Sequence, residues 1–207
     1  MRYFANPSTQ RVRDAMTAGV IDYIATPNAT WPSQRVDGVT WCADNGCFSD
    51  KWDAEKWWAW LVEHADDAAT CAFAVAPDVV GDAWKSHLRA APWLGRIREL
   101  GYPVAYVAQD GLERLPVPWA DFDVLFIGGS TEWKLGRHAR ALAAEAKARG
   151  KRVHMGRVNS LKRLMYADAI GCDSVDGTFL VFGPDVNLGR LGSWLDHLHN
   201  NPTLEFS

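Results

Sequence analysis

Short apolar runs rich in β-branched and aromatic residues alternate with segments of helical period along the whole sequence. This alternation is typical of a parallel α/β fold, in which each strand is followed by a helix that covers the sheet. Eight such units in 207 residues come close to the smallest chain that can close a (βα)8 barrel. The runs expected to form strands are Tyr3 to Asn6, Tyr23 to Thr26, Val39 to Ala43, Ala72 to Ala76, Val104 to Ala108, Val124 to Ile127, Arg152 to Met155, and Ser174 to Val175.

The helical segments lie between these runs, and Gly101, Gly150 and Gly171 each close one of them just before the next strand. The connections Asn28 to Asp37 and Leu112 to Trp119 carry prolines and little helical period. An open doubly wound sheet is the alternative fold, but no Gly-rich phosphate turn follows the first run, so a compact (βα)8 TIM barrel is favoured. The expected helices are Gln10 to Ala18, Asp53 to His64, Trp84 to Leu100, Leu135 to Arg149, Leu161 to Ile170, and Leu188 to His199.

Composition indicates a single domain spanning residues 1–207, with no low-complexity tract. A formal net charge of -3 gives no general basic signal, so a nucleic-acid partner would have to meet a local patch. No apolar stretch is long enough to span a membrane and no secretion signal begins the chain, so we expect a cytoplasmic protein without a membrane partner.

The cysteines and tryptophans favour structural roles. Cys42, Cys47, Cys71 and Cys172 include no C-x-x-C pair, so we expect reduced thiols, no bound metal and no cofactor. The eleven tryptophans could stack on exposed bases, but Trp57, Trp60 and Leu61 fall at helical spacing. Most of these rings are therefore expected to pack helices onto the barrel.

Polar residues gather where the predicted strands end. In a barrel these ends share one face, where the βα loops build active sites. Strand alternation predicts that Cys42 points inward with Asp44, and that Ala72, Ala74 and Ala76 point inward with Asp78. One Asp at a strand end is usually a helix cap or a turn residue, but six consecutive polar ends favour a joint site. The residues concerned are Asp44, Asp78, Gln109, Gly128 and Gly129, His154 to Arg157, and Asp176.

Several of these segments, in order, resemble motifs of the tRNA-guanine transglycosylase family over roughly residues 40 to 180. Asp44-Asn45-Gly46-Cys47-Phe48 is similar to its D-S-G-G-F segment, and Val107-Ala108-Gln109-Asp110-Gly111 to its V-Q-G segment. Phe126-Ile127-Gly128-Gly129-Ser130 resembles its G-G loop and His154-Met155-Gly156-Arg157-Val158 its M-G-V-G segment. Gly171-Cys172-Asp173-Ser174-Val175-Asp176 resembles G-V-D-x-F-D. Each match is short, and it is the ordered set that is informative.

The resemblance implies a role for each matched position. Asp176 would be the nucleophile that traps C1′ of the sugar, and Asp44 the acid/base group. Asp78 would accept hydrogen bonds from N1-H and the 2-amino group of guanine. Gln109 and the backbone of Gly128 and Gly129 would meet O6 of the base, and Met155 would pack on its ring, although Met155 is equally well explained as a core residue.

The sequence departs from the family in two features that serve tRNA binding there. The C-x-C-x-x-C…H zinc subdomain is absent, and Gly177-Thr178-Phe179 stands where C-x-P-T-R is usual. Compact zinc-free relatives of the family put 7-deazaguanines such as 7-cyano-7-deazaguanine into DNA in phages and bacteria. We therefore expect DNA and a 7-deazaguanine base as partners, with tRNA as the alternative acceptor and a homodimer as a possible assembly.

Arg157, Lys162 and Arg163 follow the seventh strand, where Ser160 could cap a helix, and they are candidates to hold phosphates. Solvated surface charge explains them equally well. The run Lys147, Arg149, Lys151 and Arg152 precedes that strand and is expected on the opposite face.

Three other functions stay open. A nucleoside hydrolase could use the same carboxylates with water as the attacking group. A metal-dependent hydrolase would use His154 and Asp176 as ligands, but no histidine follows the first strand. A non-enzymatic barrel could simply bind a purine or a nucleic acid.

Overall fold

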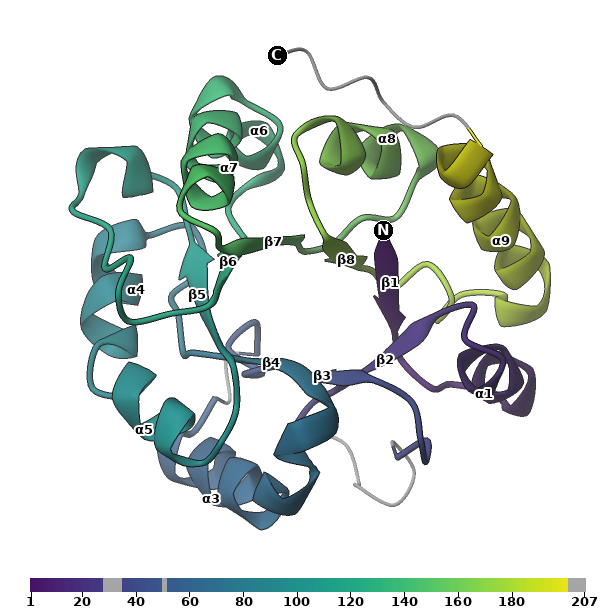
Figure 1. Ribbon diagram of the computed structural model, residues 1–207, viewed down its shortest axis with the longest axis horizontal. Coiled ribbons are helices and arrows are strands. Elements are labelled where there is room, and N and C mark those ends of the chain that lie inside the picture. The colour runs from purple at the N-terminus through teal and green to yellow at the C-terminus, as the bar shows by residue number, and fades with distance from the viewer. Residues whose placement is uncertain (28–34, 50–51, 201–207) are drawn as a thin grey trace.

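The computed structural model describes residues 1–27, 35–49 and 52–200, and its centre is a closed barrel of parallel strands (Figure 1). The strands follow one another around the barrel in sequence order, and β1 closes the ring by pairing with β8. The chain is therefore a (βα)8 TIM barrel, and all eight predicted strands are confirmed with small shifts at their ends. The strands are β1 Arg2–Ala5, β2 Asp22–Ala25, β3 Trp41–Ala43, β4 Cys71–Val75, β5 Val104–Ala108, β6 Val124–Ile127, β7 Arg152–Met155 and β8 Ser174–Asp176.

The helices form a ring outside the strands (Figure 1). No helix in the described ranges is long and apolar enough to cross a membrane. The α-helices are α1 Gln10–Thr17, α3 Ala54–Glu63, α4 Ala83–Ala90, α5 Leu94–Glu99, α6 Thr131–Lys134, α7 Arg137–Ala148, α8 Leu161–Ala169 and α9 Pro184–Asn200, with 3-10 helices η1 Ala65–Thr70 and η2 Leu112–Arg114.

Three helix predictions need correction. The single helix predicted over Trp84 to Leu100 is two helices, α4 and α5, and Pro92 lies in the break between them. The helix predicted from Leu135 begins earlier, as the short α6, and restarts as α7 after Gly136. The last helix begins at Pro184, before the predicted Leu188, because proline is well suited to a first helical turn.

Two connections were predicted to lack a helical pattern. Part of the segment Asn28 to Asp37 lies outside the described residues. Between β5 and β6 the chain forms only the 3-10 helix η2, which agrees with the prolines of that segment.

Side-chain caps begin several of the helices on the carboxyl side of the strands. The Ser160 hydroxyl accepts a hydrogen bond from the backbone N–H of Arg163, which confirms the predicted cap of α8. Asp82 caps α4 in the same way by accepting from Lys85 N–H.

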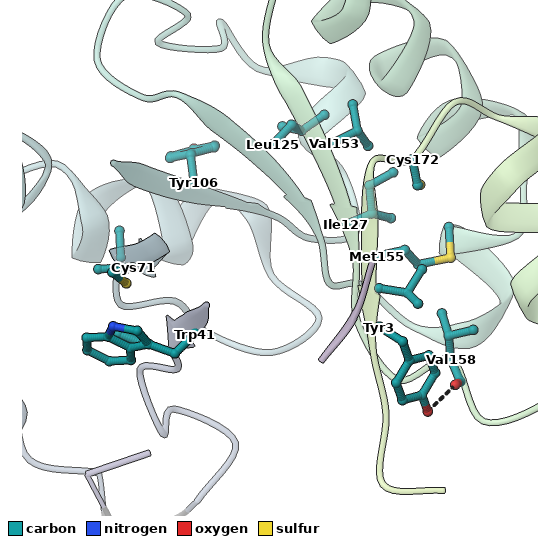
Figure 2. Packing of buried hydrophobic residues seen from close by; sticks show 14 of the residues in the cluster. Tyr3, Trp41, Cys71, Tyr106, Leu125, Ile127, Val153, Met155, Val158 and Cys172 are labelled. Carbon is teal, nitrogen blue, oxygen red and sulfur yellow. Dashed lines mark hydrogen bonds between the residues drawn. The ribbon is translucent and has the colours of Figure 1, made fainter. Parts of the chain in front are cut away.

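The core has two layers. The outer layer lies between strands and helices and contains Trp57, Trp60 and Leu61 of α3, as predicted. Figure 2 shows part of this layer, including Met155 beside Tyr3 and Val158. The inner layer fills the barrel with the side chains of Phe4, Cys42, Phe73, Val75, Ala105, Val107 and Val124.

The inward residues of β4 were predicted correctly only for Ala72, which packs against the inner layer. Phe73 and Val75 point into the barrel, while Ala74 and Ala76 belong to the outer layer. The pairing of β3 with β4 shifts by one residue after Trp41, and this irregularity reverses the alternation downstream.

Candidate active site

A cavity of about 440 Å³ lies at the carboxyl ends of the strands. Its wall includes five of the predicted site residues, contributed by the ends of five different strands: Asp44, Asp78, Gln109, Gly128 and Asp176. Arg157 also lines it. The structure thus brings the three predicted carboxylates together in one cavity.

Asp176 ends β8 and is held by two donors on different oxygens. The backbone N–H of Arg157 donates to Oδ1 at 3.0 Å. His154 Nε2 lies 3.0 Å from Oδ2. The side chain of Asp176 remains partly exposed, at 15%, and faces the cavity.

Arg157 has a strained backbone that presents its N–H to Asp176. Its φ of 61° lies in the left-handed region, where non-glycine residues are uncommon. The guanidinium donates to the carbonyl oxygens of Gly128 and Gly129, and Arg163 Nη1 donates to the carbonyl of Arg157 at 3.2 Å. Such strain persists only where the surroundings hold it, and it is common at functional sites.

Asp44 has a raised pKa. Burial is the main cause, and the negative charges of Asp176 and Asp78 add to it, bringing the pKa of Asp44 from 3.8 to about 7. Backbone N–H groups of Asn45 and Gly46 oppose this rise without cancelling it. Asp44 can therefore exchange a proton near neutral pH.

Asp78 lies at the centre of a buried hydrogen-bond network. Asn45 Nδ2 donates to Oδ1 at 2.8 Å, and Gln109 Nε2 donates to Oδ2 at 2.6 Å. Gln109 is itself fixed, because its Oε1 accepts from Gly81 N–H at 2.9 Å. Burial raises the pKa of Asp78, although these donors and Arg89 favour its charged form. Asp78 also lines the cavity, so its carboxylate can accept a hydrogen bond from a ligand there.

Two glycines in the cavity wall are required by close packing. A Cβ on Gly128 would lie 2.8 Å from Gln109 Nε2 and 2.8 Å from a methyl carbon of Val107. A Cβ on Gly156 would lie 2.8 Å from the Phe126 ring and 3.3 Å from Asp176 Oδ2. Any larger residue at either position would displace a cavity side chain.

Four residues of the predicted site, Met155, Gly129, Lys162 and Arg163, do not line the cavity. Met155 is fully buried in the outer layer, because His154 takes the inward position of β7, so its predicted ring-packing role is wrong. Gly129 is absent from the wall and accepts the Arg157 guanidinium through its carbonyl. Lys162 is an exposed residue of α8.

The Arg163 guanidinium donates to the backbone carbonyl of Arg157, a residue of the cavity wall. Arg163 therefore lies near the site and also supports its structure. The other basic run, from Lys147 to Arg152, lies at the amino end of β7, opposite to the cavity, as expected. Lys147 pairs with Asp173 at 2.7 Å and Arg149 with Glu145 at 2.9 Å.

The family resemblance assigned no role to three residues that build this site, Phe48, Asn45 and His154. Phe48 lines the cavity, is 73% exposed, and its ring centroid lies 5.6 Å from the Arg157 guanidinium carbon. Asn45 holds Asp78, and His154 holds Asp176. Phe48 and Asn45 lie within the motif around Asp44, so that segment contained the signal for both.

The hydrogen bonds of His154 do not favour a metal-dependent hydrolase with His154 and Asp176 as ligands. Both ring nitrogens of His154 have partners, Ser174 Oγ at 2.8 Å and Asp176 Oδ2 at 3.0 Å. Within the described ranges, no three His, Cys, Asp or Glu side chains are grouped to hold a metal ion.

Comparison with known proteins identifies the fold and no family. No family model and no curated protein sequence matches the chain. A mutant tryptophan synthase α-subunit from Pyrococcus furiosus has a similar structure, with a TM-score of 0.59 and 13% identity over 96% of each chain. Phosphoribosyl anthranilate isomerase from Thermus thermophilus gives a TM-score of 0.56 and 15% identity, over 96% of this chain and 100% of its own. Both are enzymes, and at this identity the likeness concerns the barrel alone.

Proposed function

We propose that this chain is a base-exchange glycosyltransferase that replaces guanine in DNA by a 7-deazaguanine through a covalent glycosyl-enzyme on Asp176. The observation that carries the proposal is the cavity in which Asp44, Asp78 and Asp176 meet, each with a different hydrogen-bond environment. Groups whose environments separate their protonation behaviour are suited to separate acid, base and nucleophile roles.

Asp176 suits the nucleophile role because its carboxylate is fixed at both oxygens and faces the cavity. One oxygen attacks C1′ of the deoxyribose, an ester bond forms, and the bond between C1′ and N9 of guanine breaks with its electron pair going to the base. The departing guanine takes a proton from Asp44, whose pKa of about 7 allows it to give one up at neutral pH.

The second half-reaction runs in reverse with the new base. N9 of the incoming 7-deazaguanine attacks C1′, its proton returns to Asp44, and Asp176 leaves as a carboxylate. A hydrolase would differ only in that water attacks in place of the base.

Asp78 suits base reading because it is a buried acceptor between two amide donors. With Asn45 and Gln109 bound on one side, its free lone pairs can accept the N1-H and 2-amino hydrogens of guanine. Phe48, largely exposed at the cavity mouth, offers a ring on which a base can stack.

The choice of DNA rests on residues 1–207, which contain no C-x-C-x-x-C…H pattern and carry Gly177-Thr178-Phe179 after Asp176 in place of C-x-P-T-R. The carboxylates lie in a cavity at the strand ends, so the nucleotide must be flipped out or single-stranded, because a duplex hides its glycosidic bonds. Single-stranded DNA is therefore expected to react at least as well as duplex DNA.

The deciding experiment offers labelled guanine to the protein with single-stranded DNA, duplex DNA and tRNA in separate reactions, with and without a 7-deazaguanine. Label is expected in DNA, and Asp176→Asn is expected to lose exchange by several powers of ten while still binding base. Label in tRNA alone would assign the tRNA-guanine reaction, and release of free base without incorporation would assign a hydrolase. Base binding without any turnover would refute the enzyme proposal.

A further inference from the structure

His154 is a fully buried histidine at the centre of the barrel, directly beneath the cavity. Its ring lies against three phenylalanines, with centroid distances of 4.5 Å to Phe126, 4.9 Å to Phe73 and 6.0 Å to Phe4. An imidazole in such apolar surroundings needs a partner for each ring nitrogen. Those partners are Ser174 Oγ and Asp176 Oδ2, both from β8.

The partners determine the tautomer. A carboxylate only accepts hydrogen bonds, so Nε2 carries the proton and donates to Asp176. In the neutral ring Nδ1 then has a lone pair, which accepts a hydrogen bond from Ser174 Oγ, 2.8 Å away. The register of the two strands enforces this arrangement, because His154 pairs directly with Ser174 in the barrel.

The contact with Asp176 has a geometric effect. The terminal torsion of an aspartate is soft, so an unsupported carboxylate rotates over a broad range. Here one donor fixes each oxygen, the Arg157 N–H on Oδ1 and His154 on Oδ2. Together they set the plane of the carboxylate and leave its remaining lone pairs facing the cavity.

We infer that His154 is a positioning residue that holds Asp176 in the orientation required to attack C1′. The inference rests on the proposed function of Asp176 as nucleophile. Misplacing a reacting group by about 1 Å can cost about 100-fold in rate. The loss of His154 is therefore expected to slow glycosyl-enzyme formation about 10- to 100-fold while changing the affinity for free base less than about twofold.

Two substitutions at this position separate positioning from packing. His154→Phe keeps an aromatic ring among the three phenylalanines but removes the donor to Asp176. His154→Gln retains an amide N–H close to the place of Nε2. The matched control is His64→Phe, because His64 is also buried and bonds the carbonyl of Trp60 from the outer layer, away from the cavity.

The kinetic test measures the single-turnover rate of glycosyl-enzyme formation on single-stranded DNA, together with KM for the base and thermal unfolding. The expected result is a slow His154→Phe with unchanged KM, partial recovery in His154→Gln, and a normal rate in His64→Phe. A wild-type rate in His154→Phe would overturn the inference, as would equal slowing by Phe and Gln in folded proteins.

A second measurement does not depend on catalysis. Nitrogen-15 NMR of the imidazole is expected to show the Nε2-H tautomer in the resting protein and to shift when Asp176→Ala removes the acceptor. The Nδ1-H tautomer, or no response to Asp176→Ala, would overturn the inference even if base exchange is confirmed. If neither nucleic acid is a substrate but the NMR result holds, the proposed function fails and the His154–Asp176 contact stands.

Discussion

Replacing Asp44 by asparagine is expected to stabilise the protein above neutral pH. The native pKa of about 7 exceeds the ordinary value of 3.8, so folding favours the protonated carboxyl. Asp44 therefore contributes stability below about pH 4 that is lost as the pH rises to about 7. The difference between these pKa values corresponds to about 4 kcal/mol, and because Asp44 lines a cavity the expected effect is about 2 to 4 kcal/mol.

Asparagine has the same shape as aspartate and stays neutral at every pH in this range. The stability gain of Asp44→Asn should thus be near zero at pH 4 and reach its plateau above pH 7, and urea unfolding followed by tryptophan fluorescence measures it. Asp82→Asn is a matched control of opposite sign, since the backbone N–H of Lys85 lowers the pKa of Asp82 and its charge favours the fold at neutral pH. Equal stability of Asp44→Asn and wild type at pH 8 would refute the argument that this carboxyl is held out of its ordinary range.

Three further substitutions address the base site, the nucleophile and a buried cation. Asp78→Asn is expected to raise KM for the base about 10- to 100-fold with a smaller effect on kcat, because an amide hydrogen replaces an acceptor; steady-state kinetics would contradict this if kcat alone fell. Gly156→Ala should lower the single-turnover rate at least tenfold, since the added Cβ would lie 2.8 Å from the Phe126 ring. An unchanged rate would mean that Phe126 moves to accommodate the added methyl group. Lys134 donates to the Gly156 carbonyl, and burial lowers the pKa of Lys134 to about 8. The free energy of unfolding of wild type, relative to that of Lys134→Met, should therefore rise by up to about 3 kcal/mol between pH 8 and pH 10.5. Urea unfolding measures this difference, and a value that does not change with pH would refute the lowered pKa.

The barrel could be predicted from the sequence because each strand is a short apolar run, and a capping glycine closes the helix before β5, β7 and β8. The polar residues at the strand ends then placed Asp44, Asp78 and Asp176 on one face. The pattern could not predict that Ala74 and Ala76 point outward, because the register shift after Trp41 depends on the pairing of β3 with β4. The sequence of either strand alone contains no signal for it. The periodicity within one strand carries no information about its register with a neighbouring strand.

The same limit applies to His154 and Met155. One of these neighbours must point inward, and the choice follows from the pairing of His154 with Ser174, which joins two successive strands separated by α8. If Asp176 points inward, Ser174 two residues before it points inward too. The pairing of Ser174 with His154 then places the His154 side chain inside the barrel. The helix break at Pro92 was visible in the sequence, since proline disfavours the helix interior.

The phenylalanines around His154 fill the barrel axis below the cavity, so within the described part of the chain the cavity opens at the carboxyl ends of the strands. Under the proposed chemistry, the departing base and the arriving base then share one passage. The first must diffuse out past Phe48 before the second can reach the ester on Asp176. Initial rates measured against nucleic acid at several fixed concentrations of base should consequently give parallel double-reciprocal lines, and an excess of either free base should compete with the nucleic acid for the resting enzyme.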